Sequence, residues 1–258
     1  MRRILLKLKS LNLTNLLYPT LGVGLFLLIW FVASKVVGVE MILPTPFQSI
    51  KKLFELFGKE EFWLAVGSTL GRSLYSFTLA VLCAILFAIV GYLIPQFARV
   101  ISPIIVILRS VPTMSIILLA LIWLDSASAP VLIAFLILFP QIYASFLSAL
   151  NGINADLIDM SKAYKVPVWK RIISLYIPEI LPNSLETMKA NVSLGVKVTI
   201  AGEVLAQTFS SMGVNMQISK MYFDTAELLG WTIMAIVLSY ALEGIFSLIK
   251  YFAVRGRK

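Results

Sequence analysis

Charged and hydroxyl side chains occur inside segments of this chain that are otherwise long and apolar. In the segment 183–206, Glu186, Lys189, Ser193 and Lys197 follow one another at spacings of three and four residues, so on a helix they share one face. A charge near the centre of a bilayer costs about 2.5–3.5 kcal/mol on insertion scales, and such charges face a protein interior or a water-filled passage. The pattern therefore indicates a helix face that is turned toward a protein interior or a water-filled passage and away from lipid.

Other interpretations of this face remain open. Glu186 and Lys189 fit an interfacial i,i+3 pair, with the Lys189 ammonium extended to the membrane surface. Lys197 lies about 20 Å into its helix at 1.5 Å per residue, where it either faces the passage or pairs with an acid on another segment. Glu203, six residues further on, points to a different face and would reach the passage only across a subunit interface.

The apolar stretch 101–124 carries a second polar group. Arg109, Ser110, Thr113 and Ser115 surround Pro112, whose missing N–H loosens a helix. The residues that we predict to line a translocation pathway are Arg109, Thr113, Lys189, Ser193, Lys197 and Glu203.

Enzymatic chemistry has little support in the composition. The chain has no histidine and a single cysteine, Cys83, which removes the usual general base and any cysteine-based zinc site. No G-x-x-x-x-G-K-[ST] phosphate loop occurs, because Gly58-Lys59 is followed by Glu60. We expect a chain that is not an enzyme, with no catalytic residue, no metal ligand and no cofactor of its own.

The segment DLIDMSKAYKVPVWKRIISLYIPEILP, residues 156–182, is polar and rich in proline between two apolar stretches. Asp156 and Asp159 suit the start of a short helix, and Pro167 suits the first turn of a second one. Pro178 and Pro182 are expected to break the pattern after that. The segment predicts a protruding element with one apolar side, and the alternative is a solvated loop that lies on lipid headgroups.

The elements that must position these residues are membrane helices. Of 258 residues, 59% are hydrophobic and 14% are charged, with a mean hydropathy of +0.92, whereas soluble domains have about a quarter of their residues charged. We predict an all-α integral membrane fold with about six spans. The spans are placed at 17–37, 70–94, 101–124, 129–150, 183–206 and 229–252, with an amphipathic membrane-surface helix within 44–66.

The distribution of Lys and Arg sets the expected orientation. The net charge of +9 is concentrated at the two termini and in loops on one side, which places that side in the cytoplasm and does not require a nucleic-acid partner. The chain is therefore divided into a cytoplasmic tail at 1–16, a transmembrane domain at 17–252 that includes a cytoplasmic loop at 151–182, and a basic cytoplasmic tail at 253–258. We expect a multi-pass protein of the cell (inner) membrane with both termini cytoplasmic.

The polar loop resembles the EAA loop of ABC importer permeases. In that loop Glu-Ala-Ala is followed by a glycine and then by an apolar-x-apolar-Pro run; here Asp159-Met160-Ser161, then Lys165, then Leu175-Tyr176-Ile177-Pro178 stand at that spacing. Lys165 replaces the glycine. If that turn requires a positive φ, a lysine there costs about 1 kcal/mol.

Other motifs resemble the nitrate/sulfonate/taurine branch of these permeases. "ILPTPFQSIKKL" at 42–53, Thr69-Leu70-Gly71-Arg72, Arg109-Ser110-Val111-Pro112 and Glu203 are similar to its motifs and occur in its order. From residues alone we expect Arg72 to be an interfacial anchor. The resemblance covers about residues 40–250.

The resemblance implies the type I ABC importer permease fold and a set of partners. These are cytoplasmic ATPase subunits that hold ATP and Mg, a second permease subunit in a homodimer, an extracellular or periplasmic substrate-binding protein, and membrane lipid, but no nucleic acid. The residues that it places at the ATPase contact are Asp156, Asp159, Met160, Ser161, Tyr164 and Lys165.

The substrate is less constrained. The cations Arg109, Lys189 and Lys197 favour a small organic or inorganic anion such as a sulfonate, unless each is already paired with an acid such as Glu186 or Glu203. The branch also includes carriers of vitamin precursors. A six-span channel or receptor that is not driven by ATP is the alternative from another class.

Overall fold

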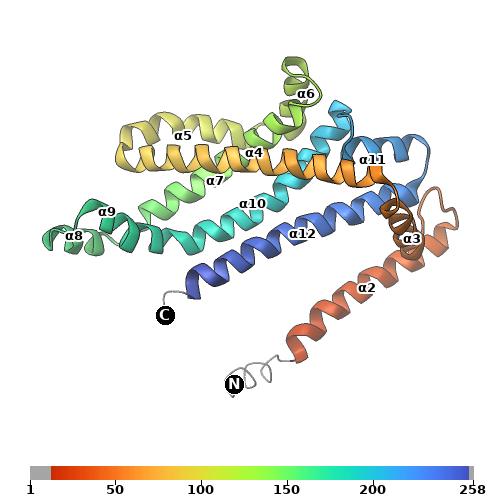
Figure 1. The fold of residues 1–258 in the computed structure, drawn as a ribbon, viewed down its shortest axis with the longest axis horizontal. Helices are drawn as coiled ribbons and strands as arrows, with labels where there is room; N and C mark the ends of the chain where they lie inside the picture. Colours follow the sequence, from red (N-terminus) through yellow and green to blue (C-terminus); the bar gives the residue numbers. More distant parts are fainter. Residues whose placement is uncertain (1–12, 256–258) are drawn as a thin grey trace.

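The computed structural model describes residues 13–255, which form helices joined by short turns, with no strand in that range. The helices are α2 (Leu13–Val37), α3 (Pro46–Phe57), α4 (Glu60–Leu93), α5 (Pro95–Ser110), α6 (Thr113–Trp123), α7 (Ala129–Asn151), α8 (Ala155–Ala163), α9 (Val168–Arg171), α10 (Ile177–Ala206), α11 (Met212–Met221) and α12 (Thr225–Arg255), with a π-helical turn at Ile172–Tyr176 between α9 and α10. The predicted all-α membrane fold is confirmed (Figure 1). The basic residues at 2–9 and 257–258, on which the prediction of cytoplasmic termini partly depends, lie outside the described residues.

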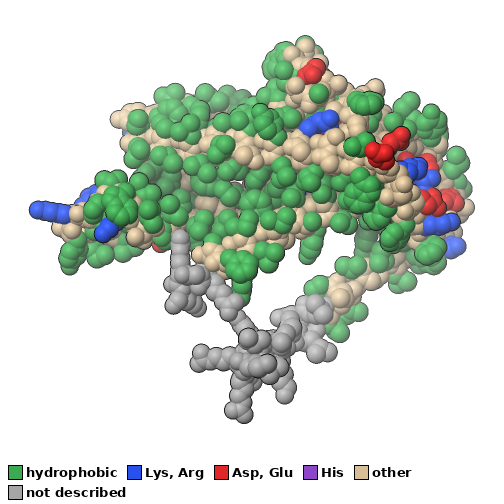
Figure 2. Space-filling model, viewed as in Figure 1, with side chains coloured by type: hydrophobic (Ala, Val, Ile, Leu, Met, Phe, Trp, Pro, Cys, Tyr) green, Lys and Arg blue, Asp and Glu red, His purple; other side chains and the backbone are tan. Residues whose placement is uncertain are grey.

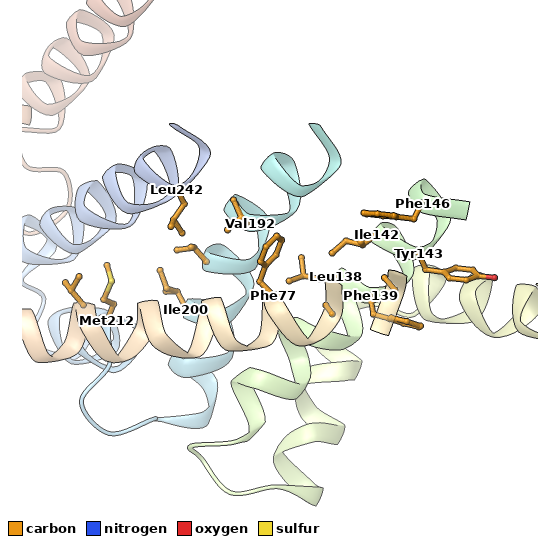
Figure 3. Close-up of a cluster of buried hydrophobic side chains, with 14 of the residues drawn as sticks. Phe77, Leu138, Phe139, Ile142, Tyr143, Phe146, Val192, Ile200, Met212 and Leu242 are labelled. Carbon is orange, nitrogen blue, oxygen red and sulfur yellow. The ribbon is translucent and has the colours of Figure 1, made fainter. Parts of the chain in front are cut away.

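The core lies where α4, α7 and α10 pack together, with α12 along α10. Ala80, Ala84 and Ala88 recur every four residues on α4 and are fully buried, so this row of small side chains lets α7 approach closely. Leu138 of α7 and Val192 of α10 belong to the same cluster (Figure 3). These helices form the rigid frame that positions the polar residues.

Four helices in the described range are long and apolar enough to cross a membrane, or five if the bent pair α5 and α6 counts as one span. α10 has sufficient length, but it carries Glu186, Lys189, Lys197 and Glu203 and so falls outside that set. α2 extends away from the bundle (Figure 1), and its apolar side chains are largely exposed. The Trp30 indole N–H ties α2 to the following turn by donating to the Pro44 carbonyl at 3.0 Å.

The predicted span at 101–124 is not one continuous helix, because α5 and α6 meet at an angle of 99° and form either a broken span or a re-entrant loop. Val111 precedes Pro112, and the proline ring disfavours the helical region for the residue before it. Val111 accordingly has φ −64° and ψ 130°, and Pro112 follows with φ −57° and ψ 131°. The break places Arg109 and Thr113 on two helices, on either side of the bend, instead of along one straight helix.

The predicted amphipathic helix within 44–66 is α3, and the second span begins earlier than predicted, at Glu60. Thr45 and Gln48 form a reciprocal capping box, with Pro46 in the first turn. The buried side of α3, Ser49, Leu53 and Leu56, packs mainly on α12. α3 is therefore anchored to the bundle by its own apolar face.

The expectation that Pro178 and Pro182 end the helical pattern is wrong. From Val168 to Ala206 the chain is helical without interruption, through α9, the π-helical turn and α10. Pro178 has no N–H to donate to the carbonyl four residues earlier. The π-helical turn at Ile172–Tyr176, which is wider than an α-helical turn, directly precedes this part of the helix and accommodates the proline. The predicted bend remains at Pro167, where α9 starts.

Candidate functional site

A cavity of about 520 Å³, here named the Asn191 cavity, lies where the α5–α6 break meets α7 and α10. Half of its lining residues are apolar, and the polar ones come from four helices, α5, α6, α7 and α10. Its lining residues are Leu108, Arg109, Val111, Thr113, Ile116, Ile137, Gln141, Thr187, Ala190 and Asn191.

The polar groups of this cavity are only partly satisfied within the protein. The buried Asn191 amide donates to the Thr187 carbonyl at 2.9 Å, while its Oδ1 has no hydrogen-bond partner among the described residues. Arg109 adds a guanidinium with five donors, and Gln141 adds an amide. A buried acceptor without a partner is costly, so the cavity is suited to a polar solute that supplies the missing hydrogen bonds.

The structure brings some of the predicted pathway residues together and separates others. Arg109 and Thr113 line the Asn191 cavity; Lys189 is half-buried and Ser193 is buried, and neither lines it. Lys197 is exposed on a helix whose neighbouring positions are mostly buried. It lies two turns, about 10 Å, beyond Ala190 on the same face, and Ala190 belongs to the cavity wall. Lys197 therefore shares a helix face with one residue of the cavity wall, while Ser193 and Leu194 between them are buried and half-buried.

Glu203 lies elsewhere, in a buried group here named the Glu203 network, which consists of Thr69, Arg72, Glu203 and Gly213. The Glu203 side chain is fully buried and pairs with Arg72 Nη1 at 3.0 Å. Its other oxygen accepts from the Thr69 hydroxyl at 2.9 Å and from the Gly213 N–H at 3.2 Å. Arg72 was expected to be an interfacial anchor, but it forms an ion pair with Glu203 inside the subunit.

The local sequence explains why this network forms. Ser211 caps α11 by accepting from the Val214 N–H. In the same first turn the Gly213 N–H donates to the Glu203 carboxylate and the Met212 N–H donates to the Thr69 hydroxyl oxygen, and a carboxylate suits the positive end of a helix. A Cβ atom on Gly213 would lie 2.5 Å from the Glu203 Cβ and 2.7 Å from the Ile200 carbonyl oxygen. Only glycine fits, and the network ties α4, α10 and α11 together.

The acids proposed as neutralising partners of the pathway cations are both engaged elsewhere. Glu203 pairs with Arg72, and Glu186 pairs with Lys250 of α12. Among residues 13–255, Arg109, Lys189 and Lys197 have no acidic partner within 4.0 Å. The subunit therefore keeps these three positive charges without a direct counter-charge.

The end of the bundle formed by α3 and α11 carries a further ion-pair group. Lys52 Nζ lies 2.7 Å from Asp224 Oδ2 and 3.7 Å from Glu227 Oε2. The hydrogen bond that Lys52 donates to Asp224 raises the pKa of Lys52 above its ordinary value despite partial burial. Burial raises the pKa of Asp224, but the Lys52 hydrogen bond and the Glu227 N–H outweigh it and hold that pKa below its ordinary value. This group clamps α3 to the start of α12.

The helices α8 and α9 protrude at the opposite end of the molecule (Figure 1), and no residue of either helix is buried. Figure 2 shows lysine and arginine side chains beside hydrophobic ones at this end. Exposed apolar side chains include Met160, Tyr164, Val168, Trp169 and Ile173. Asp156, Asp159 and Lys165 are also exposed, and Ser161 is half-buried. All six predicted coupling residues thus lie on α8 and the turn after it.

The turn after α8 requires a positive φ, at the position where Lys165 replaces a glycine. Lys165 has φ 52°, and the Val166 N–H donates to the Ser161 carbonyl at 3.0 Å while the Lys165 N–H donates to that of Lys162 at 2.9 Å. These two bonds define a Schellman motif. The motif is therefore preserved, although the left-handed conformation of Lys165 destabilises the turn by roughly 1 kcal/mol.

Sequence reasoning missed several residues that the structure places at these sites. Gln141 and Asn191 line the Asn191 cavity, and each is an amide within a largely apolar stretch of α7 or α10, which is the signal that the sequence offered. Thr69 was identified only as part of the Thr69-Leu70-Gly71-Arg72 motif, and Gly213, far from it in sequence, has no pattern of its own. Their role depends on the contact of α4 with α11, which only the fold supplies.

Comparison with known families identifies similar proteins. Residues 80–257 match the family described as "Binding-protein-dependent transport system inner membrane component". The taurine transport system permease protein TauC of Escherichia coli (strain K12) is 23% identical over 220 residues, which are 83% of this chain and 80% of that protein. The formylaminopyrimidine transport permease protein ThiX of Halalkalibacterium halodurans is 22% identical over 190 residues, 73% of this chain and 76% of that protein.

Among solved structures, a chain of the MetNI methionine ABC transporter in an inward-facing form has a similar fold. The TM-score is 0.63 at 19% identity, and the match covers 74% of this chain and 96% of that one. At this identity the likeness shows the fold alone, and it agrees with the predicted type I importer permease architecture.

Proposed function

The chain belongs to the family of binding-protein-dependent transport system inner membrane components, in the taurine-like branch of ABC permeases, and from this premise we propose that it forms the translocation pathway for a small anion and is driven through the α8–α9 element. As a permease subunit of an ABC importer it is a multi-pass protein of the inner membrane. It works with ATPase subunits that bind ATP and Mg, and it has no catalytic chemistry of its own.

The observation that carries the coupling proposal is the exposed α8–α9 element. Two helices with no buried residue expose aromatic and aliphatic side chains next to cations. Exposed apolar surface rimmed by charges is typical of a protein contact. The element joins α10 through an unbroken helix, so a displacement of α9 by an ATPase would be passed directly to the pathway helix. Asp156, Asp159, Met160, Ser161, Tyr164 and Lys165 form the contact in this proposal.

The coupling proposal is tested with Asp159→Lys and with Ser161→Trp. Because Asp159 is exposed and its pair with Lys162 is exposed too, the reversal should leave the fold intact while it weakens assembly and substrate-stimulated ATP hydrolysis by tenfold or more. Glu61→Lys, an exposed acid at the other end of the bundle, is the matched control. Normal assembly and normal stimulated hydrolysis in both α8 variants would reject the contact.

The anion proposal is supported by the charges along the pathway. Arg109 in the Asn191 cavity, and Lys189 and Lys197 on α10, have no acidic partner within 4.0 Å in the described part of the chain. Fixed positive charge in a passage of low dielectric favours an anion over a cation by direct Coulomb attraction. A sulfonate fits this chemistry, and TauC, a taurine permease by its name, is a relative.

Uptake in Lys197→Met and Lys197→Arg variants tests the anion proposal. Lys197 is exposed and unpaired, so both variants should fold, and Arg should retain uptake of a sulfonate while Met loses most of it. Equal uptake by Met and Arg would show that no charge is needed at this position. A vitamin precursor remains the second substrate class, because ThiX is named as a formylaminopyrimidine permease; competition between the two solutes in one uptake assay would separate them.

The proposed orientation puts both termini and the α8–α9 element in the cytoplasm, and the α3–α11 end outside, where a substrate-binding protein delivers the solute to a homodimer of this subunit. Cysteines at Lys59 and at Lys165, in a background with Cys83 replaced, should react with an impermeant thiol reagent from opposite sides. Labelling of both positions from outside would overturn the orientation. Failure to co-purify with a nucleotide-binding subunit would favour a channel or receptor.

A further inference from the structure

A second cavity, here named the Tyr143 cavity, lies between α5 and α7 and has a volume of about 540 Å³. Its polar wall consists of Arg99, Ser102 and Arg109 from α5, and Tyr143, Ser148 and Asn151 from α7. Arg109 also belongs to the Asn191 cavity, so the two cavities meet at one guanidinium. None of the residues assigned to transport above, other than Arg109, lines the Tyr143 cavity.

The Tyr143 hydroxyl is a buried polar group without a partner. The residue is 3% exposed, and its hydroxyl makes no hydrogen bond with any described residue. Figure 3 shows the ring extending from α7 with the oxygen at its tip. A Cβ atom on Gly91 would lie 3.3 Å from this oxygen and 3.4 Å from Ala98 Cβ, so the absence of a side chain at Gly91 leaves room around the hydroxyl. Buried hydroxyls normally have partners, and this one lies in the cavity wall.

The charge of the cavity has one sign. Arg99 and Arg109 are ten residues apart on α5, about 15 Å along the helix, and they line the same cavity. The residues that line it include no aspartate or glutamate, and neither arginine has an acidic partner within 4.0 Å among residues 13–255. Each guanidinium offers donors in a planar fork, which matches the geometry of carboxylate, phosphate and sulfonate oxygens.

We propose that the Tyr143 cavity binds a small oxyanion, held by Arg99 and by the Tyr143 hydroxyl, with Ser102 and Ser148 as further donors. The charged oxygens of an oxyanion accept hydrogen bonds, and the groups named here are all able to donate. The site excludes a simple cation because both of its charges are positive. This inference goes beyond the proposed function, since it holds whether or not the transported solute is an anion. The oxyanion is either free in solution or the phosphate of a lipid headgroup.

The site is tested on the purified full chain in nanodiscs of zwitterionic lipid, with radiolabelled inorganic phosphate as the probe. Arg99→Gln should weaken phosphate binding about tenfold or more, because a charged hydrogen bond is lost. Arg99→Lys should keep binding within several-fold of the native chain. Tyr143→Phe removes a hydroxyl that has no protein partner, so the fold should be unchanged while binding falls by roughly threefold to tenfold. Tyr240→Phe, on the exposed side of α12, is the matched control and should bind as the native chain does.

The source of the oxyanion is distinguished by repeating the measurement with phosphatidylglycerol in the nanodiscs. A free anion as the occupant predicts that phosphate binding is unaffected by this lipid. A headgroup as the occupant predicts that the lipid displaces phosphate, and that native mass spectrometry finds it retained by the native chain but not by Arg99→Gln. Either result supports the site. Absence of both phosphate binding and lipid retention, or equal binding by the native chain, Arg99→Gln and Tyr143→Phe, overturns it.

Discussion

The two ends of this membrane bundle differ in how firmly their parts are held. At the α3–α11 end, the Glu203 network joins α4, α10 and α11, and Lys52 joins α3 to the start of α12. At the α8–α9 end, the helices bury no residue, and their one ion pair, Lys162 with Asp159, is exposed. Hydrogen bonds and ion pairs thus hold the helices of the α3–α11 end together, while the α8–α9 end exposes surface that a partner can cover.

This difference indicates how movement would be distributed. An element with few buried contacts opens and shifts at low cost, whereas a buried, satisfied polar network resists displacement. A driving partner should therefore act at the α8–α9 end, and the α3–α11 end should move as one body with α4 and α10. The predictions below test each side of this contrast, beginning with the largest expected effect.

Arg72→Ala should be the most damaging single substitution at the α3–α11 end. Glu203 is 0% exposed and would keep a buried charge without its partner, which typically costs about 3–5 kcal/mol. Thermal unfolding of the purified chain should show a large loss of stability and increased hydrogen exchange in α11. Lys51→Ala, which removes an exposed pair with Glu55, is the control and should change little. A loss below about 1 kcal/mol for Arg72→Ala would place it in the range of exposed pairs and contradict this view.

Gly213→Ala should destabilise the same end by crowding. The added methyl group would meet the Glu203 Cβ and two backbone atoms within 2.7 Å, and overpacking of this kind costs about 1–3 kcal/mol. Gly67→Ala in α4, where nothing lies within 4 Å of the new Cβ, should instead be neutral or slightly stabilising. If both substitutions have the same effect on the unfolding temperature, the close approach of α11 to α10 is not what constrains residue 213.

Lys165→Gly should affect only the α8–α9 end. Glycine adopts φ 52° without the strain that lysine bears, so the turn should gain up to about 1 kcal/mol. Lys165→Ala removes the same charge but keeps the strain, and comparison of the two separates conformation from charge. Hydrogen exchange at Val166 would report the gain locally. An equal exchange rate in the glycine and alanine variants would show that the turn is not strained.

The Lys52–Asp224 clamp should give the smallest effect, about 1 kcal/mol or less, and a defined dependence on pH. The lowered pKa of Asp224 contributes stability above its ordinary value of 3.8, which is lost as the pH falls through the folded pKa. The raised pKa of Lys52 contributes stability below its ordinary value of 10.5, which is lost as the pH rises through the folded pKa. The stability difference between the native chain and Lys52→Met should therefore be constant between about pH 5 and 9 and shrink outside that window. A difference that peaks within the window would point to another group.

Much of the fold follows from the sequence, because long apolar segments and proline positions report directly on helices. The amphipathic α3, the bend at Pro167 and the positive φ at the Lys165 turn are all local effects, and local rules identify them. The angle at the break between α5 and α6 was underestimated. A single proline such as Pro112 can either loosen a helix or allow a turn of 99°, and the sequence does not distinguish the two. Pro178 and Pro182 were predicted to end the helix, but it continues through both. A π-helical turn just before Pro178 accommodates the hydrogen bond that this proline cannot donate.

The candidate sites could be predicted only in part. Arg109 and Thr113 stand beside a conspicuous proline, and both line the Asn191 cavity. The pairing of Glu203 with Arg72 joins residues more than a hundred positions apart, and one sequence carries no signal for a contact of that kind. The role of Tyr143 depends on a missing partner, which can be recognised only when the surroundings of its hydroxyl are known.

The unbroken helix from Val168 to Ala206 makes the α9–α10 run a lever. It is about 55–60 Å long at 1.5 Å per residue, its far end is fixed by Glu203, and its near end is free. A tilt of about 5° around the fixed end would carry α9 through roughly 5 Å, one helical pitch, but would move Lys197 by less than 2 Å. A large displacement of α8 and α9 at the proposed ATPase contact would thus produce only a small displacement of Lys197.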